Sequence, residues 1–318
     1  MTTRLLASVA TEARPGGRNE DFVLTGSDVT VLLDGAGLPD SLDTGCAHGV
    51  PWFVRTLGSA LHHRATDRRT ALRECLTEAI RDTARAHGPG CDLSSPFTPS
   101  ATVVVARTDG GRPSGERPDG EGSDGEGSGD ERSDGERLNG ERSGDERFEW
   151  LVLADSTLAL RLPGGVRTVS DHRVSDVTTP QRAALAAEVA HLAPAARAAV
   201  FARAQRRTMN TAQGYWVAAA DPGAAGHALV GSVPLTEVRA AALLSDGAAR
   251  SVDDFGVRSW PDLLRELEAH GPHHLIARTR ELERSDPDCL RWPRGKCHDD
   301  ATAVLLLPPA DGAPGGTV

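Results

Sequence analysis

Four short apolar runs in this 318-residue chain are each joined to an aspartate. Strands with carboxylates at their ends hold several oxygen ligands at one rigid edge, and clustered carboxylates repel one another unless a cation lies between them. Oxygen-only ligands favour Mg²⁺ or Mn²⁺ over zinc or copper. The runs and their aspartates are 29–33 with Asp34, 150–154 with Asp155, 240–244 with Asp246, and 301–307 with Asp299 and Asp300.

The composition excludes several classes of protein. A formal net charge of -10 argues against a nucleic-acid-binding surface. No apolar stretch approaches the roughly 18 residues of a membrane span, and the apolar run at the N-terminus is too short for a signal peptide. We therefore expect a cytoplasmic protein with no nucleic-acid or membrane partner. Widely spaced cysteines, odd in number, predict free thiols in such a chain.

Hydrophobic patterns predict alternating groups of strands and helices. Leu72, Leu76 and Ile80, for example, recur at the spacing of one helix face. This order of elements favours an α+β fold with layers of antiparallel sheet and helix. The expected strands are 4–10, 29–33, 100–106, 148–154, 157–162, 166–169, 215–219, 228–233, 238–245 and 301–307, and the expected helices are 45–63, 68–87, 180–207, 260–269 and 272–283.

Residues 109–147 repeat Gly-Glu-Arg and Ser-Asp-Gly units and contain almost no apolar side chains. Such a segment buries too little surface to offset its ordering entropy, so it predicts disorder. It lies between two predicted strands, and the simplest interpretation is an enlarged hairpin loop, whose closure cost grows only slowly with length. The alternative is a linker between two domains.

Each aspartate motif has an ordinary explanation, because an Asp-Gly pair after a strand is usually a turn. Their joint order is more specific, and it resembles that of the metal-dependent protein phosphatases of the type 2C family. The motifs that carry the resemblance are Asn19-Glu20-Asp21, Asp34-Gly35 after its apolar run, Asp155-Ser156, Leu244-Ser245-Asp246-Gly247, and Asp299-Asp300-Ala301-Thr302.

The resemblance implies a four-layer α-β-β-α sandwich of two antiparallel sheets with flanking helices. Residues 1–308 would form a single domain, with 109–147 as a disordered acidic insert and 309–318 as a flexible tail. The implied protein is a monomer.

The resemblance also implies the ligands of a metal site. Asp34 would bridge two Mg²⁺ or Mn²⁺ ions, with the Gly35 carbonyl as a further ligand. Asp246 and Asp299 would hold one ion, and Asp21 or Glu20 would reach the other. The remaining expected ligands are Asp155, at a third and weaker site, and Asp300, which replaces the closing asparagine of the family.

The implied activity is hydrolysis of phosphoserine and phosphothreonine monoesters in phosphoproteins. Two divalent ions turn a bridging water into the nucleophile and neutralise phosphoryl oxygens. The residues expected to act in catalysis are Asp34 and a phosphate-binding arginine. The family places that arginine five residues before the Asp of its first motif, where this chain has Gly16. Arg18 is our candidate, and Arg14 lies nearby.

The carboxylates match the family better than the substrate-binding groups do. Ala154 replaces a glycine and Thr157 replaces an arginine of the family motif. The alternative function is therefore a catalytically weak or inactive homologue, a binding module that uses the same fold. The acidic cluster opposes that alternative, because an inactive module has no use for repelling carboxylates.

Histidines and cysteines leave two questions open. Cys46 and His48 together with Cys297 and His298 would form a thiolate–imidazole zinc site, although their spacing matches no known zinc finger. Histidine is also the usual general acid for a leaving alkoxide. The candidates for that role are His48, His62 and His172.

Overall fold

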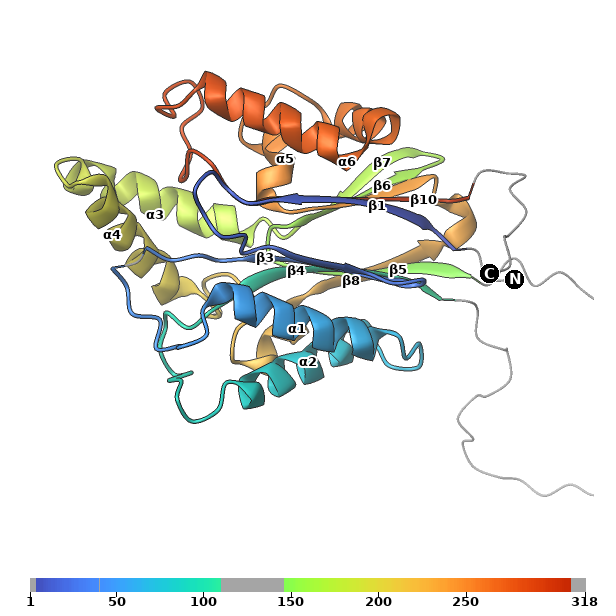
Figure 1. Ribbon diagram of the computed structural model, residues 1–318, viewed down its shortest axis with the longest axis horizontal. Coiled ribbons are helices and arrows are strands. Elements are labelled where there is room, and N and C mark those ends of the chain that lie inside the picture. Colours follow the sequence, from blue (N-terminus) through green and yellow to red (C-terminus); the bar gives the residue numbers. More distant parts are fainter. Residues whose placement is uncertain (1–3, 40, 110–145, 310–318) are drawn as a thin grey trace, which may run out of the picture.

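Two five-stranded antiparallel sheets stack face to face in the computed structural model, which describes residues 4–39, 41–109 and 146–309 (Figure 1). Their strand orders are β1-β10-β9-β6-β7 and β2-β3-β4-β5-β8. The strands are β1 (Leu6–Glu12), β2 (Phe22–Thr25), β3 (Val29–Gly35), β4 (Ala101–Asp109), β5 (Arg147–Leu153), β6 (Thr157–Leu162), β7 (Gly165–Val169), β8 (Leu229–Pro234), β9 (Ala240–Leu244) and β10 (Ala301–Leu307).

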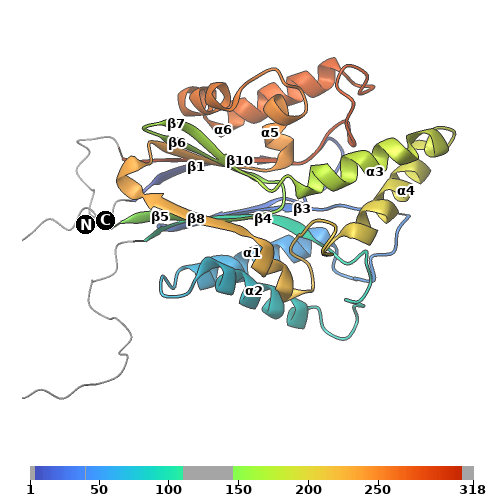
Figure 2. The same cartoon turned by 180° about the vertical axis from the view of Figure 1, so that it is seen from behind.

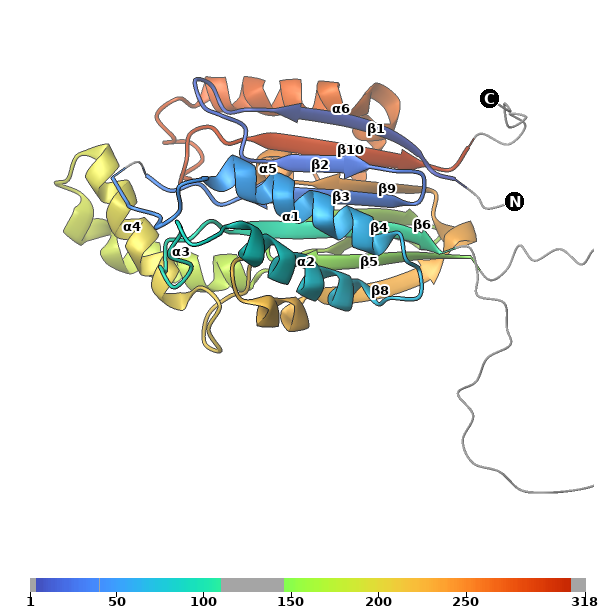
Figure 3. The ribbon, with the colours of Figure 1, turned by 60° about the horizontal axis from the view of Figure 1, so that its bottom comes forward.

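Helices cover the outer face of each sheet (Figure 2). Helices α1 (Val50–Ala65) and α2 (Leu72–Ala86) cover the sheet that contains β3 and lie in front of it in Figure 3. Helices α5 (Asp246–Asp253) and α6 (Trp260–Ser285) lie over the other sheet, and α3 (Arg173–Val189) and α4 (Pro194–Thr208) project at one end. Short 3₁₀ turns occur at Pro222–His227 and Leu235–Glu237. The predicted four-layer sandwich is confirmed.

The alternation of side chains along β3 explains how one strand joins two apolar cores. Leu32 packs between the two sheets, against residues such as Leu243. Val31 and Leu33 point the other way and pack under α1. All three side chains are fully buried, and each contributes roughly 1.5–3 kcal/mol of burial free energy. The strand whose end carries Asp34 is therefore rigidly held on both faces.

The predicted helix 180–207 is wrong, because the structure has two helices there. Helix α3 begins earlier and ends at Val189, and α4 starts with Pro194 in its first turn. Ala193, just before that proline, is extended with ψ 150°. A residue before proline disfavours the helical region, so Pro194 ends one helix and begins the next.

Gly271 separates the two helices predicted at 260–269 and 272–283. It interrupts α6 with φ 80° and ψ 172°, a backbone conformation that suits glycine. The strand predicted at 215–219 is wrong, because the structure has only isolated bridges at Tyr215 and Ala218 there. The prediction also omitted strand β2 and helix α5. Both are short, with 4 and 8 residues, so hydrophobic periodicity barely registers in them.

The expectations for the acidic insert and the tail concern residues 110–145 and 310–318, which lie outside the described residues. On either side of the insert, β4 and β5 pair directly, from Val103 opposite Leu153 to Asp109 opposite Arg147. This pairing is what the hairpin interpretation expects. The single-domain assignment stays a prediction.

Cys289 and Cys297 form a disulfide, which corrects the expectation that every cysteine is free. Their Cα atoms lie 6.0 Å apart, a usual span for such a bond. The chain turns between them around the buried Asp286, whose carboxylate accepts hydrogen bonds from the backbone N–H groups of Leu290 and Trp292. The other three cysteines are free. Within the part of the chain that is described, no helix has the length and apolar character of a membrane span.

Candidate metal centre

Asp34 and Asp246 lie side by side although they follow strands of different sheets. Asp34 is the penultimate residue of β3, and Asp246 begins α5 shortly after β9. The backbone N–H of Asp246 donates a hydrogen bond to Asp34 Oδ2 at 3.3 Å. Two carboxylates that the sequence places 212 residues apart thus meet at one edge of the sandwich.

The glycines after these two aspartates serve close packing, not a left-handed turn. Neither glycine has a positive φ. A methyl group at Gly35 would collide with the carbonyl oxygen of Glu20, and one at Gly247 would collide with the carbonyl oxygen of Asp300. Glycine at both positions therefore lets the strand ends approach the loop before β2 and the beginning of β10. The Gly35 carbonyl, an expected ligand, accepts a hydrogen bond from Gly37 N at 3.0 Å.

Asp299, just before β10, is held by two cations. Its Oδ1 accepts a hydrogen bond from Lys296 Nζ at 2.9 Å, and Arg250 Nη2 lies 3.5 Å from its Oδ2. The Arg250 guanidinium is itself fixed by the fully buried Glu283, 2.6 Å away. These contacts hold the Asp299 carboxylate in place, and burial, followed by the charge of Asp299, raises the pKa of Asp246.

Asp300 and Glu20 order a loop. Asp300 accepts hydrogen bonds from Arg14 N at 2.7 Å, from Arg14 Nη1 at 3.1 Å and from Glu20 N at 3.0 Å. Arg14 Nη1 also lies 3.3 Å from Glu20 Oε2. The carboxylate of Asp300 is thus already occupied in tying the loop between β1 and β2 to β10.

Asp21 has one satisfied and one unsatisfied carboxylate oxygen. Oδ2 accepts a hydrogen bond from Thr302 Oγ1 at 2.7 Å, whereas Oδ1 is buried and has no hydrogen-bond partner among the described residues. Burial raises the pKa of Asp21, the Thr302 hydrogen bond opposes that rise, and the charges of Asp246, Asp300 and Asp299 add to it, so that the pKa is about 7. A buried, unpaired carboxylate oxygen costs free energy unless a cation or donor meets it.

Mutual repulsion links the aspartates into one cluster. Burial first, and then the charges of Asp246, Asp21 and Asp299, raise the pKa of Asp34 well above its ordinary value. Burial and the charge of Asp246 likewise raise the pKa of Asp155 to about 7. Asp246 keeps solvent access, which screens part of this repulsion. We name Asp21, Asp34, Asp155, Asp246 and Asp299 the carboxylate cluster.

Lys296 is a second cation, besides Arg250, that faces the carboxylate cluster, and the sequence analysis overlooked it. Besides its contact with Asp299, its charge lowers the pKa values of Asp34, Asp155 and Asp246. A signal was available, because Lys296 is the only lysine among the 318 residues. Apart from the histidines, all the other basic side chains of the sequence are arginines.

Arg18 and Arg14 differ in their surroundings. Arg14 is engaged with Glu20 and Asp300, whereas Arg18 is exposed. A groove of about 420 Å³ is lined in part by Arg18, Glu20, His48, Trp52 and Arg55, and Glu20 directly precedes Asp21 of the cluster in the sequence. Arg18 is therefore placed to meet a ligand that enters beside Glu20, but Arg14 is not.

The three candidate histidines lie in different places. His62 packs against the turn at Gly26, next to Val29 at the beginning of β3. The 7 residues of β3 span roughly 20 Å, so His62 is at the wrong end of the strand to act beside Asp34. His172 is exposed at the start of α3, and His48 lines the groove with Arg18.

The zinc site with Cys297 and His298 does not form. Cys297 is bonded to Cys289, and His298 Nδ1 lies 2.8 Å from Glu283 Oε2. The spacing of these motifs in the sequence gave no information about which cysteines and histidines meet in space.

Comparisons with known proteins identify the architecture. No family model and no curated protein matches the sequence. The catalytic domain of the serine/threonine phosphatase PstP, solved with two manganese ions, superimposes with a TM-score of 0.51 and 16% identity over 96% of this chain and 98% of that one. PstP has also been solved from Mycobacterium tuberculosis, with the same identity and TM-score. Stp1 from Staphylococcus aureus gives a TM-score of 0.51 and 14% identity over 98% and 97%. The chain thus has the fold of the type 2C metal-dependent serine/threonine phosphatases.

Proposed function

We propose that this chain is a metal-dependent phosphatase that hydrolyses phosphoserine and phosphothreonine monoesters in proteins. The observation that carries the proposal is the convergence of Asp34 and Asp246, from two different sheets, in a cluster with Asp299 and the half-satisfied Asp21. Phosphatases of known structure share the fold, and one of them holds two manganese ions. We expect the same kind of cofactor here, Mg²⁺ or Mn²⁺.

The donor set fits divalent ions that prefer oxygen ligands. Carboxylates that repel one another have raised pKa values and unpaired oxygens when no ion lies between them. The cluster has both features, since its pKa values are raised and Oδ1 of Asp21 is unpaired. We assign Asp34, Asp246, Asp299 and Asp21 as ligands of two ions and Asp155 as a ligand of a third, weaker one. Glu20 and Asp300 act by ordering the adjacent loop, because Arg14 already engages them.

The side chains of this chain would divide the work of catalysis. Bound divalent ions would supply a water of lowered pKa and positive charge against the phosphoryl oxygens. Arg18 would bind the phosphate by charge-assisted hydrogen bonds. Thr302 and Arg250 orient Asp21 and Asp299, so that the carboxylates are in place before substrate enters. His48 and His172 remain the candidates for protonating the leaving alkoxide.

A binding module is the second candidate function. The observation that favours it is Lys296, whose ammonium already neutralises part of the cluster and would compete with a metal ion. A module of this kind would retain the sandwich and bind a partner without hydrolysing phosphate.

Hydrolysis of p-nitrophenyl phosphate with and without Mn²⁺, beside calorimetric counting of bound Mn²⁺, separates the two functions. We expect activity only with Mn²⁺, and loss of both Mn²⁺ binding and activity in Asp34→Ala with the fold retained. Glu281→Gln, at an exposed carboxylate of α6, is the matched control and should behave as wild type. Metal binding without turnover would support the binding module, and absence of both would overturn the metal site.

The finer expectations from the sequence remain predictions. They are a cytoplasmic location, a monomeric state and the absence of nucleic-acid and membrane partners.

A further inference from the structure

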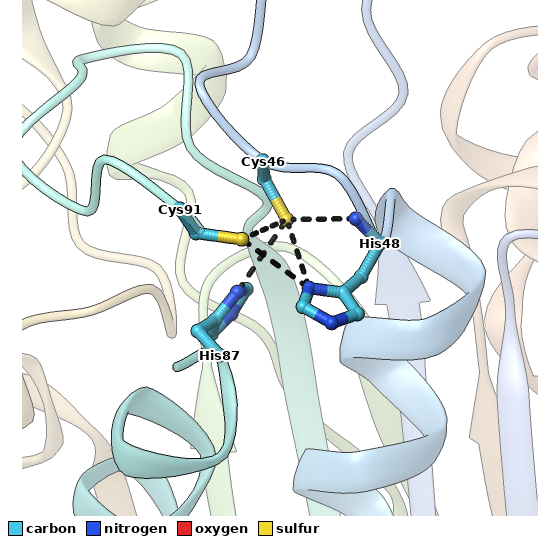
Figure 4. Close-up of side chains that lie close together, drawn as sticks. All are labelled: Cys46, His48, His87 and Cys91. Carbon is cyan, nitrogen blue, oxygen red and sulfur yellow. Dashed lines mark hydrogen bonds between the residues drawn. The ribbon is translucent and has the colours of Figure 1, made fainter. Parts of the chain in front are cut away.

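Two cysteines and two histidines converge beside the groove, outside the carboxylate cluster (Figure 4). Cys46 and His48 precede α1, His87 follows the last turn of α2, and Cys91 lies in the loop after it. One potential ligand atom from each residue lies within 4.8 Å of all the others. We name these four residues the Cys₂His₂ cluster.

The distances within this cluster are those expected for ligands of one tetrahedral ion. The two sulfur atoms are 3.7 Å apart. Cys46 Sγ lies 3.8 Å from His48 Nδ1 and 3.4 Å from His87 Nδ1, and Cys91 Sγ lies 3.3 Å from His48 Nδ1. Zinc–sulfur bonds of about 2.3 Å and zinc–nitrogen bonds of about 2.0–2.1 Å give tetrahedral edges of roughly 3.3–3.8 Å.

The backbone holds the two loops of the cluster together independently of any ion. Asp92 N, next to Cys91, donates a hydrogen bond to the carbonyl oxygen of Gly45, next to Cys46, at 2.8 Å. Gly45 has φ 68°, a conformation that a side chain would strain. The ligand-bearing positions are therefore set by the fold.

Neighbouring groups also orient the ligands. The Trp52 ring stacks on His48 with centroids 4.2 Å apart and meets the edge of His87 at 4.6 Å. The backbone N–H of His48 donates to Cys46 Sγ at 3.4 Å, a contact that favours the thiolate. Orientation of ligating side chains by surrounding groups is a general feature of protein metal sites.

We propose that Cys46, His48, His87 and Cys91 bind one structural Zn²⁺ ion. Thiolate and imidazole ligands select zinc over Mg²⁺ and Mn²⁺, so this site and the carboxylate cluster would take different metals. Four protein ligands leave no open position, which is the arrangement of a structural site. The ion ties the beginning of α1 to the end of α2 and fixes the part of the groove wall that His48 forms, in a groove that Arg18 and Glu20 also line.

The ion would also remove His48 from the candidates for general acid, because its Nδ1 would be a ligand. His172 would then be the remaining candidate. This consequence concerns the proposed phosphatase activity, but the zinc site does not depend on that activity.

The first experiment measures metal content and ligand geometry in the full chain. Protein purified in reductant without chelator should contain one equivalent of zinc by mass spectrometry. The Asp34→Ala variant should keep that equivalent, which separates this site from the carboxylate cluster. Replacement by Co²⁺ should produce the intense visible absorption of a tetrahedral cobalt–thiolate centre.

Matched variants then assign the ligands. Cys46→Ser and Cys91→Ser should each lose the bound zinc and the cobalt absorption. Cys75→Ala removes a free thiol elsewhere, in the core under α1, and His63→Ala removes an exposed histidine of α1; both should keep the zinc. If the serine variants fail to fold, cobalt absorption of the wild-type protein still decides the question.

Three outcomes would overturn the proposal. The first is reduced wild-type protein that binds neither zinc nor cobalt at micromolar concentration. The second is metal that stays bound in both serine variants. The third is a Cys46–Cys91 disulfide that persists in reductant, because the 3.7 Å sulfur separation also suits oxidation.

Discussion

Lys296 Nζ lies 2.9 Å from Asp299 Oδ1, so the only lysine of the chain is directed into the carboxylate cluster. Burial lowers the pKa of Lys296, but the charges of Asp299, Asp246 and Asp34 outweigh it and raise that pKa. Together with the Arg250 guanidinium, this ammonium neutralises part of the charge of the cluster. A divalent ion must therefore be bound against its positive charge.

Lys296→Met should strengthen Mn²⁺ binding at pH 8 by about tenfold. The reason is that a positive charge a few ångströms from the ion makes the binding free energy less favourable by more than ~1.4 kcal/mol at the dielectric of a protein surface. Calorimetric titration measures the change. Lys296→Arg keeps the charge and should stay within about threefold of wild type. Equal affinity in the methionine variant and wild type would show that the ammonium does not oppose the ion.

Mn²⁺ should increase the reaction of Lys296 with an amine-acylating reagent. The raised pKa and the contact with Asp299 suppress the nucleophilic free amine, and an ion on Asp299 would release the side chain. Because the chain has a single lysine, mass spectrometry can measure acylation at one side chain and compare it with acylation of the N-terminal amine. The N-terminal amine is the internal control, and a decrease at Lys296 would contradict the displacement.

Arg18→Ala should raise KM for a phosphopeptide by at least about tenfold, the effect of losing a hydrogen bond between charged groups, while Mn²⁺ affinity is unchanged. Arg55→Ala, in the same groove, is the matched control and should change KM less. Arg14→Ala should instead lower the melting temperature, because it releases Glu20 and Asp300. A KM effect confined to Arg14→Ala would move the phosphate-binding role to that residue.

Gly247→Ala should weaken Mn²⁺ binding and lower the free energy of unfolding by roughly 1–3 kcal/mol, the usual cost of an overpacked site. The new methyl group would meet the Asp300 carbonyl and push the start of α5, with Asp246, away from Asp34. Gly226→Ala has open space at its Cβ and serves as the control. Denaturant unfolding and Mn²⁺ titration measure the two effects, and wild-type values for both would show that the close approach is not needed.

Asp286→Asn should destabilise the protein at pH 7, and the difference from wild type should vanish in acid. Burial raises the pKa of Asp286, but hydrogen bonds from Arg291, Arg294, Trp292 and Leu290 lower it from 3.8 to about 2. A lowered folded-state pKa gives stability that is present above pH 3.8 and is lost as the pH falls to about 2. Melting temperatures between pH 7 and pH 2 test this, with the exposed Asp288→Asn as control. A difference that persists at pH 2 would contradict it.

The sequence predicted the strands better than the positions of the side chains between them. β6 occupies 157–162 as predicted, because its apolar residues alternate between two buried faces and a glycine turn follows. The helix predicted at 180–207 failed because its alanine-rich composition outweighed the stop signal of Pro194 in the prediction. The resemblance placed Asp34 and Asp246 together, and their hydrogen bond shows that they meet.

Contacts made by loops were not predictable from the chain alone. The sequence suggested Cys46 and His48 as ligands together with Cys297 and His298, but the side chains that lie close to them are His87 and Cys91. The two halves of that cluster are brought together by the packing of α1 on α2, which no local pattern encodes. Lys296 was missed for the same reason, since its role depends on Asp246 and Asp34 from two distant segments as well as on the nearby Asp299.

The hairpin of β4 and β5 makes the chain tolerant to engineering at a defined point. Gly35 pairs with Ala101 at the end of β4 beside the carboxylate cluster, whereas Asp109 pairs with Arg147 at the opposite end. A fluorescent protein or affinity tag inserted between residues 109 and 147 would therefore emerge about 27 Å from Ala101 along the strand, on the side of the sandwich away from the groove. This position offers an internal reporter site that leaves the groove beside Arg18 open.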